Sequence, residues 1–107
     1  MIVVSRFTVA ESDGEAFLVR ARDALDALRP ATGYRRGWVG RAADDPTEWI
    51  LGTEWAGVGA YRRALSGFDV RVRVATLLAE ARDEPSAFEI LHAGGENPPD
   101  VEQSGRA

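Results

Sequence analysis

The N-terminal segment of the chain predicts a strand that is apolar on both faces, and this feature constrains the fold most strongly. Residues 2–9 alternate β-branched and aromatic side chains, with Ile2 and Val4 on one face and Val3 and Phe7 on the other. Such a strand belongs to a sheet that is covered on both sides. We therefore expect helices of the same chain on one face of the sheet and a second copy of the chain on the other, which makes a homodimer.

The remaining elements are predicted from apolar periodicity and turn residues. They are a helix between Ser12 and Pro30, strands over residues 34–43 and 48–55, a helical region over 58–82 that breaks at Ser66–Asp69, and a last strand over 86–92. The turn signal "DDPT" joins the two middle strands into a hairpin. The order β-α-β-β-α-β is the ferredoxin-like α+β arrangement, in which two helices pack on one face of a four-stranded antiparallel sheet.

Capping residues predict where the helices begin. Ser12 and Glu15 have the spacing of a capping box, and Asp69 suits the N-cap of the helix that resumes over residues 70–82. The alternation "VRVRV" at residues 70–74 is also compatible with a strand. The following "ATLLAEAR" favours a helix, and we predict a helix for the whole segment.

The length of 107 residues suits a single domain. We assign residues 1–92 to this domain and residues 93–107 to a flexible tail, because the tail is rich in glycine, proline and charge and has little to bury. The N-terminal segment lacks a basic leader and is interrupted by Arg6, so we expect neither a signal peptide nor a membrane span. A cytoplasmic location is expected.

Composition excludes several classes of function. The formal net charge of -4 gives no basic surface for nucleic acid. Without cysteine the chain has no disulfide and no thiolate site, and without lysine it has no Schiff-base chemistry. His92 is the single histidine and cannot form a metal site alone. The glycine pattern of a dinucleotide site is also missing, and we expect neither a metal nor another cofactor.

Two segments carry a resemblance to a known family. "PATGY" (residues 30–34) enters the second strand, and "WAGVGAYR" (residues 55–62) follows the third. Together with the element order, these segments make residues 1–92 resemble the antibiotic biosynthesis monooxygenases, which are small dimeric α+β barrel proteins. Trp55, Ala60 and Tyr61 match the family's tryptophan and its alanine-aromatic pair.

The nearest branch in motif is that of the cofactor-free oxygenases that turn anthrones into quinones. The resemblance implies that Trp55 and Tyr61 are the pocket tryptophan and tyrosine. It implies Arg73 as the pocket arginine, with Arg71 as the alternative if the gap in the alignment falls elsewhere. Leu51 stands at the substrate-contact position where this branch has an asparagine. The polar contact that the asparagine makes to the substrate is therefore missing in this chain.

The resemblance implies a cofactor-independent monooxygenase that acts with molecular oxygen on an aromatic polyketide- or quinone-like molecule. In that chemistry Arg73 stabilises the substrate anion, Tyr61 hydrogen-bonds or relays a proton to a substrate oxygen, and Trp55 stacks on the ring. Trp38 in the hairpin is a further candidate for substrate contact, with burial at a dimer interface as its alternative. A non-catalytic dimeric protein that binds small molecules on the same fold is the alternative function.

Structural explanations compete with each of these roles. Trp55 would also serve as core beneath the helix, and Arg73 as a solvated helix arginine. Arg6 in the apolar first strand is expected to pair with Glu54 across strands.

The family's heme-degrading branch is disfavoured. It uses an asparagine where this chain has Ser5 and a tryptophan where it has Ala64. It also needs a helix histidine, and residues 57–82 contain none.

Overall fold

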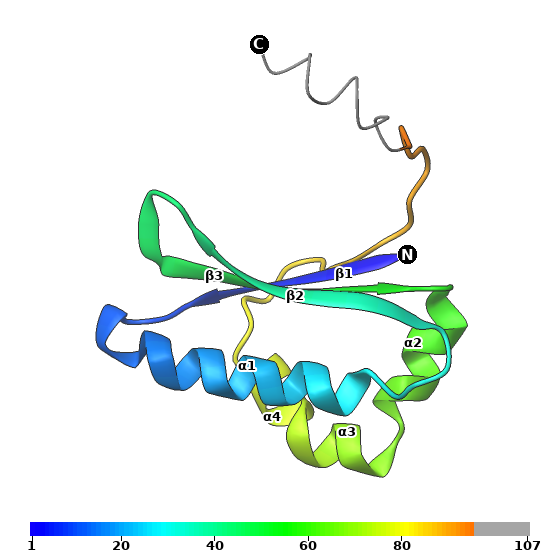
Figure 1. The fold of residues 1–107 in the computed structure, drawn as a ribbon, viewed down its shortest axis with the longest axis horizontal. Helices are drawn as coiled ribbons and strands as arrows, with labels where there is room; N and C mark the ends of the chain where they lie inside the picture. The colour runs from blue at the N-terminus through cyan, green and yellow to red at the C-terminus, as the bar shows by residue number, and fades with distance from the viewer. Residues whose placement is uncertain (96–107) are drawn as a thin grey trace, which may run out of the picture.

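The computed structural model describes residues 1–95 as one sheet with helices on one side (Figure 1). The elements are β1 (Ile2–Thr8), the short 3-10 helix η1 (Glu11–Asp13), α1 (Gly14–Leu28), β2 (Tyr34–Ala42), β3 (Asp45–Trp55), α2 (Val58–Leu65), α3 (Phe68–Arg73), α4 (Ala75–Leu78) and β4 (Ala87–Phe88). The strands are antiparallel neighbours in the order β2-β3-β1-β4. This confirms the predicted ferredoxin-like α+β fold. The predicted tail lies outside the described residues from residue 96 on.

The strand β1 occupies an inner position in the sheet and pairs with β3 along its whole length. Val3 lies opposite Thr53, and Phe7 lies opposite Trp49. Because paired residues point to the same face, alternate residues of both strands turn toward the helices. The intervening residues, such as Val4 and its partner Gly52, turn to the opposite face, which we call the outer face of the sheet.

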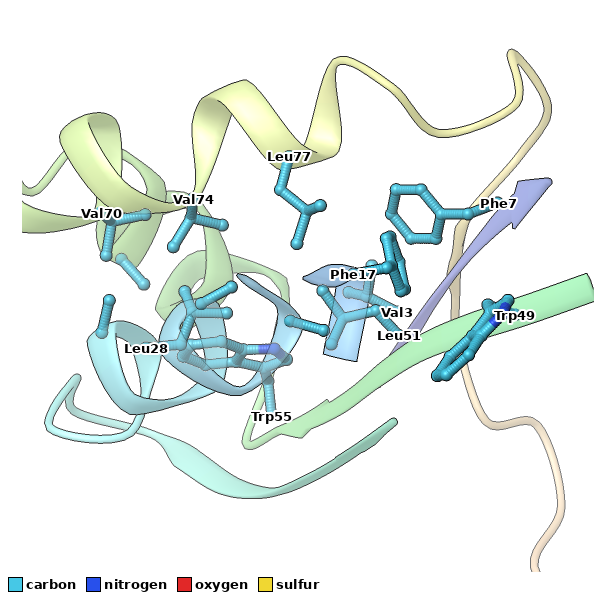
Figure 2. Packing of buried hydrophobic residues seen from close by; sticks show 14 of the residues in the cluster. Val3, Phe7, Phe17, Leu28, Trp49, Leu51, Trp55, Val70, Val74 and Leu77 are labelled. Atoms are coloured by element: carbon cyan, nitrogen blue, oxygen red, sulfur yellow. The ribbon is translucent and has the colours of Figure 1, made fainter. Parts of the chain in front are cut away.

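The core fills the space between the inner face of the sheet and the helices. Phe17 of α1 packs on Phe7, with ring centroids 5.0 Å apart, and on Trp49, at 5.2 Å (Figure 2). Ala21 and Ala24 are fully buried, and their small side chains let α1 lie close to the sheet. Further along the chain, α3 and α4 cover α1 and the sheet with Val70, Val74 and Leu77.

The helix starts differ from the capping predictions. Ser12 lies inside η1, and α1 begins at Gly14 without a side-chain hydrogen bond to its first turn. The predicted capping box is therefore wrong. Residues 70–73 are helical as predicted, but α3 starts at Phe68 with Gly67 at its N-cap, and Asp69 lies in the first turn.

The last strand is shorter than predicted. β4 pairs only Ala87 and Phe88 with β1, whereas the sequence predicts a strand over residues 86–92. The preceding segment still follows the edge of β1 through two backbone hydrogen bonds. The N–H of Arg82 donates to the carbonyl of Arg6 at 2.8 Å, and the N–H of Val4 donates to the carbonyl of Ser86 at 2.7 Å.

The register of the strands shows that one predicted pair on the outer face is wrong. Arg6 lies opposite Ile50, and Glu54 pairs instead with Arg36 at 2.7 Å. Unbroken alternation would put Trp38 on the same face as Tyr34, but an irregularity between Tyr34 and Arg36 separates them. Tyr34 faces the helices, whereas Trp38 lies over Gly52 on the outer face, where a Cβ at Gly52 would overlap the indole.

Among residues 1–95, no helix combines the length and the apolar character that crossing a bilayer demands.

Candidate functional site

A cavity of about 350 Å³ lies between the helical layer and the edge of β1. Its walls come from β1, from α2, from the end of α4 and from the segment that leads to β4. The lining residues are Ser5, Tyr61, Leu78, Ala79, Ala81, Arg82, Asp83 and Ser86. Most of this lining is polar, so the cavity suits a ligand that carries several oxygen atoms.

The position of α2 is fixed by its close approach to the loop that precedes β2. Gly33 has a φ of 90°, a conformation that favours glycine, and a Cβ there would overlap the side chain of Ala60. The carbonyl of Gly33 also accepts a hydrogen bond from the N–H of Ala56 at 2.7 Å. Ala60 and Ala64 share the buried face of α2, and Tyr61, the residue after Ala60, lines the cavity.

Tyr61 lines the cavity and carries a neutral hydroxyl. Its ring is half-buried and packs on Trp55 with ring centroids 5.5 Å apart. Burial raises the pKa of the Tyr61 hydroxyl above its ordinary value of 10.0. The group is therefore protonated at neutral pH and is able to donate a hydrogen bond. Within residues 1–95, no hydrogen bond joins this hydroxyl to another residue.

Trp55 supports Tyr61 from within the core. Only 1% of Trp55 is exposed, and its indole N–H donates to the hydroxyl of Thr53 at 2.8 Å. Tyr34 packs on the same indole at 5.3 Å in a nearly perpendicular arrangement. Trp55 therefore packs on two tyrosines, and of these three residues only Tyr61 lines the cavity. Leu51 is likewise buried, at 3% exposure.

The predicted arginine lies elsewhere on the helical layer. Arg73 on α3 points to α1, where its guanidinium pairs with Asp23 at 2.6 Å, and it also pairs with Asp69 at 3.2 Å. Arg73 lines a separate groove between α1 and α3 together with Val19 and Val72. The alternative residue, Arg71, is exposed on α3.

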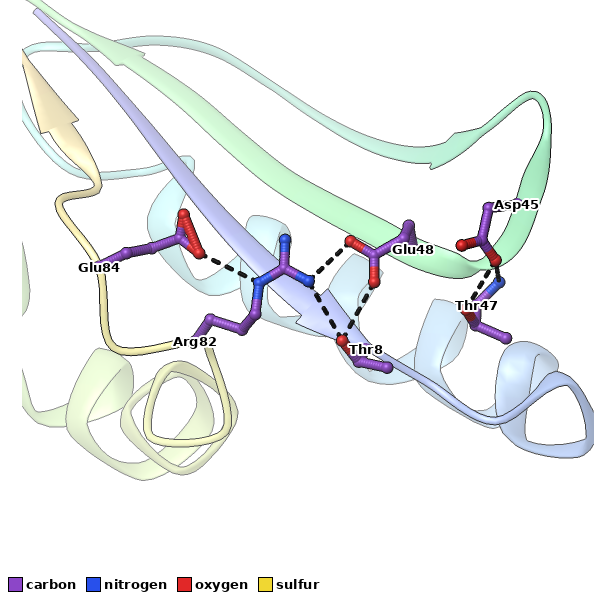
Figure 3. A network of polar contacts seen from close by, with 6 residues as sticks. All are labelled: Thr8, Asp45, Thr47, Glu48, Arg82 and Glu84. Carbon is purple, nitrogen blue, oxygen red and sulfur yellow. Dashed lines mark hydrogen bonds and ion pairs between the residues drawn. The ribbon is translucent and has the colours of Figure 1, made fainter.

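Arg82 is the arginine that lines the Tyr61 cavity. Its side chain crosses β1 and ties the cavity wall to the sheet (Figure 3). Its Nη1 donates to Glu48 at 2.7 Å and to Thr8 at 3.2 Å, and its Nε donates to Glu84 at 3.0 Å. Sequence reasoning missed Arg82, because it lies outside the segments that carry the family resemblance.

Within the described residues, no group of three or more His, Cys, Asp or Glu side chains is arranged to hold a metal ion.

Comparison of whole structures identifies the fold. SnoaB, a cofactor-independent oxygenase from Streptomyces nogalater, superposes with a TM-score of 0.67 at 23% identity, covering 89% of this chain and 96% of SnoaB. A Nitrosomonas europaea protein named as an antibiotic biosynthesis monooxygenase gives a TM-score of 0.65 at 18% identity, covering 85% of this chain and 98% of that one. The chain has the fold of the antibiotic biosynthesis monooxygenases. Sequence comparison alone finds no matching family model and no matching curated protein.

The antibiotic biosynthesis monooxygenase fold places the residues predicted from the sequence in three different locations. Tyr61 reaches the cavity, with Trp55 and Leu51 in the core behind it. Arg73 lies in the groove of the helical layer, and Trp38 lies on the outer face. The structure thus brings Tyr61 and Trp55 together and places Arg73 and Trp38 apart from them.

Proposed function

We propose that this protein is a cofactor-independent monooxygenase that binds an aromatic polyketide- or quinone-like substrate in the Tyr61 cavity. The observation that carries the proposal is the Tyr61 hydroxyl, which is protonated, half-buried against Trp55 and without a hydrogen-bond partner among residues 1–95. Further support comes from the fold, which this chain shares with SnoaB, a cofactor-independent oxygenase.

The proposed chemistry draws its electrons from the substrate. An electron-rich aromatic carbanion passes one electron to molecular oxygen, and the resulting radical pair forms a carbon–oxygen bond. The O–O bond of the peroxide then breaks, so that a CH₂ group and O₂ give a carbonyl group and water. The protein has to bind the aromatic acid, favour its deprotonated form and exclude bulk water.

Tyr61 is assigned to the substrate oxygen that gains negative charge on deprotonation. A neutral phenol donates a hydrogen bond to such an oxygen, and the bond strengthens as charge develops. Asp83 supplies a carboxylate in the cavity lining and is the proposed acceptor of the substrate proton. Arg82 is the cationic residue among those that line the cavity. The role of Arg73 stays a prediction of the family resemblance.

Oxygen uptake by purified protein, without added flavin or metal, tests the proposal on a panel of hydroxylated anthrones and hydroquinones. We expect Tyr61→Phe to lower kcat/KM by roughly ten- to a thousandfold, because one hydrogen bond to a developing charge is lost. Tyr34→Phe is the matched control, since it removes a hydroxyl from the other tyrosine that packs on Trp55. If the wild-type protein takes up oxygen no faster than buffer alone, whichever compound is added, the proposal is contradicted.

A non-catalytic small-molecule-binding protein is the second candidate. One observation favours it: Leu51 is an apolar, buried residue at the position where the cofactor-free oxygenases have a polar one. The same assay separates the two functions. Saturable binding of the aromatic panel without any oxygen uptake would support the binding protein.

A further inference from the structure

Ser5 is a buried polar side chain on the inner face of β1. It lies between Val3 and Phe7 in a strand whose other core-facing residues are apolar, and only 6% of it is exposed. The other buried polar side chain of the described core, Thr53, accepts a hydrogen bond from the indole of Trp55. No hydrogen bond joins the hydroxyl of Ser5 to any residue in the described range 1–95.

The Ser5 hydroxyl is not sealed inside protein. Among residues 1–95, no fully enclosed side-chain nitrogen or oxygen atom lacks a hydrogen-bond partner. The hydroxyl of Ser5 therefore retains access to the cavity that this residue lines. A buried hydroxyl without a protein partner is unfavourable, and the cost disappears when a ligand supplies the partner.

The backbone opposite Ser5 explains why there is room for a ligand. Arg82 is hydrogen-bonded to Arg6, and Ser86 is hydrogen-bonded to Val4. One residue of β1, Ser5, thus faces three residues of the neighbouring segment, Asp83 to Pro85. Two extra residues make this segment bulge away from the edge of β1, and Pro85 has no N–H to pair with the strand.

From these observations we infer that Ser5 is a second substrate-binding residue of the Tyr61 cavity. The hydroxyls of Ser5 and Tyr61 come from β1 and α2, and each binds a different oxygen substituent of one ligand. The preferred ligand is therefore an aromatic compound with at least two oxygen substituents. The inference rests on the proposed function only in taking this cavity as the substrate site.

Ligand binding tests the inference without requiring turnover. The probes are a dihydroxyanthracene, which carries two oxygen substituents, and the monohydroxyanthracene that lacks one of them, titrated by tryptophan fluorescence. We expect Ser5→Ala and Tyr61→Phe each to weaken binding of the dihydroxy compound about three- to tenfold, as for the loss of one neutral hydrogen bond. With the monohydroxy compound, one of the two substitutions should no longer weaken binding, because the ligand oxygen that its hydroxyl binds is absent. Ser66→Ala is the matched control, because it removes a serine hydroxyl outside the cavity.

The possible outcomes separate this inference from the proposed function. If Ser5→Ala binds both probes as tightly as the wild type does, the role of Ser5 is overturned, even if oxygen uptake is observed. Weaker binding by Ser5→Ala, together with no oxygen uptake by the wild type, would support Ser5 and overturn the oxygenase. A wild-type protein that binds neither probe saturably would overturn the inference. A melting temperature of Ser5→Ala equal to that of the wild type shows that the variant folds.

Discussion

Tyr61 and Trp55 divide packing and chemistry between them. The indole of Trp55 is enclosed by Tyr34, Tyr61 and Thr53, so its contribution is to fill the core and to fix the ring of Tyr61. Tyr61 packs on that indole and lines the cavity. The site is thus built on a rigid aromatic support, which holds the hydroxyl in place before a substrate arrives.

The raised pKa of Tyr61 predicts how stability depends on alkaline pH. The folded state holds the phenol proton above pH 10.0, where the unfolded chain releases it, so this stability is complete below pH 10.0 and is lost as pH rises through the folded pKa. The chain has two tyrosines and neither lysine nor cysteine, which leaves few other groups in this window. Urea denaturation should show a fall in unfolding free energy above pH 10.0 that is smaller in Tyr61→Phe. An identical fall in both proteins would contradict the burial of this hydroxyl.

At the scale of elements, the segment between α4 and β4 forms part of the cavity wall. It has little regular structure, and residues 82–86 are tied to β1 by two backbone hydrogen bonds. The side chain of Arg82 adds contacts to Glu48, Thr8 and Glu84 (Figure 3). Arg82 therefore holds the wall against the sheet.

Replacing Arg82 with glutamine should loosen this wall. Exposed ion pairs contribute about 0–1 kcal/mol each, so we expect a small change in global stability. Amide hydrogen exchange over residues 79–86 should nevertheless become faster. Arg73→Gln is the matched control, because its side chain is similarly exposed, at 32% against 37%, and pairs with Asp23 instead. Equal exchange rates over residues 79–86 in both variants would contradict the role of Arg82.

Sequence patterns predicted the elements whose conformation depends mainly on their own residues and not on contacts with distant segments. β1, α1 and the β2–β3 hairpin follow from alternation, from helical spacing and from turn residues. The short β4 could not be predicted, because its length depends on the bulge opposite Ser5, which arises between segments far apart in the chain. The register irregularity after Tyr34 moved Trp38 to the outer face for the same reason.

The residues of the candidate site likewise differ in whether the sequence alone could predict them. Tyr61 lies within a recognisable motif. Arg82 does not, and its place beside the cavity depends on long-range pairing with β1.

At the scale of the whole molecule, the two faces of the sheet differ in what covers them. The helices lie on one side (Figure 1). The other side, the outer face, carries partly exposed apolar side chains. These are Ile2, Val4, Trp38, Ile50 and Phe88. We propose that a second copy of the chain covers this face and forms a homodimer, because burying these side chains removes apolar surface from water.

Light scattering at micromolar concentration should give about twice the chain mass of 11.6 kDa. Ile50→Arg places a charge on the outer face and should shift the protein to a monomer. Val72→Arg is the matched control, since Val72 lies on the helical layer and is 59% exposed, and it should remain a dimer. A wild-type monomer would contradict the proposed interface.

The most direct test of cofactor-independent oxygenation at Tyr61 is mass spectrometry of the product formed under isotopically heavy oxygen gas. The protein is freed of flavin and metal and is incubated with the hydroxylated anthrones. We predict a quinone that carries one heavy oxygen atom, formed by the wild type and by Tyr34→Phe at similar rates and roughly ten- to a thousandfold more slowly by Tyr61→Phe. No labelled quinone from any compound, or labelled quinone at equal rates from all three proteins, would contradict the account.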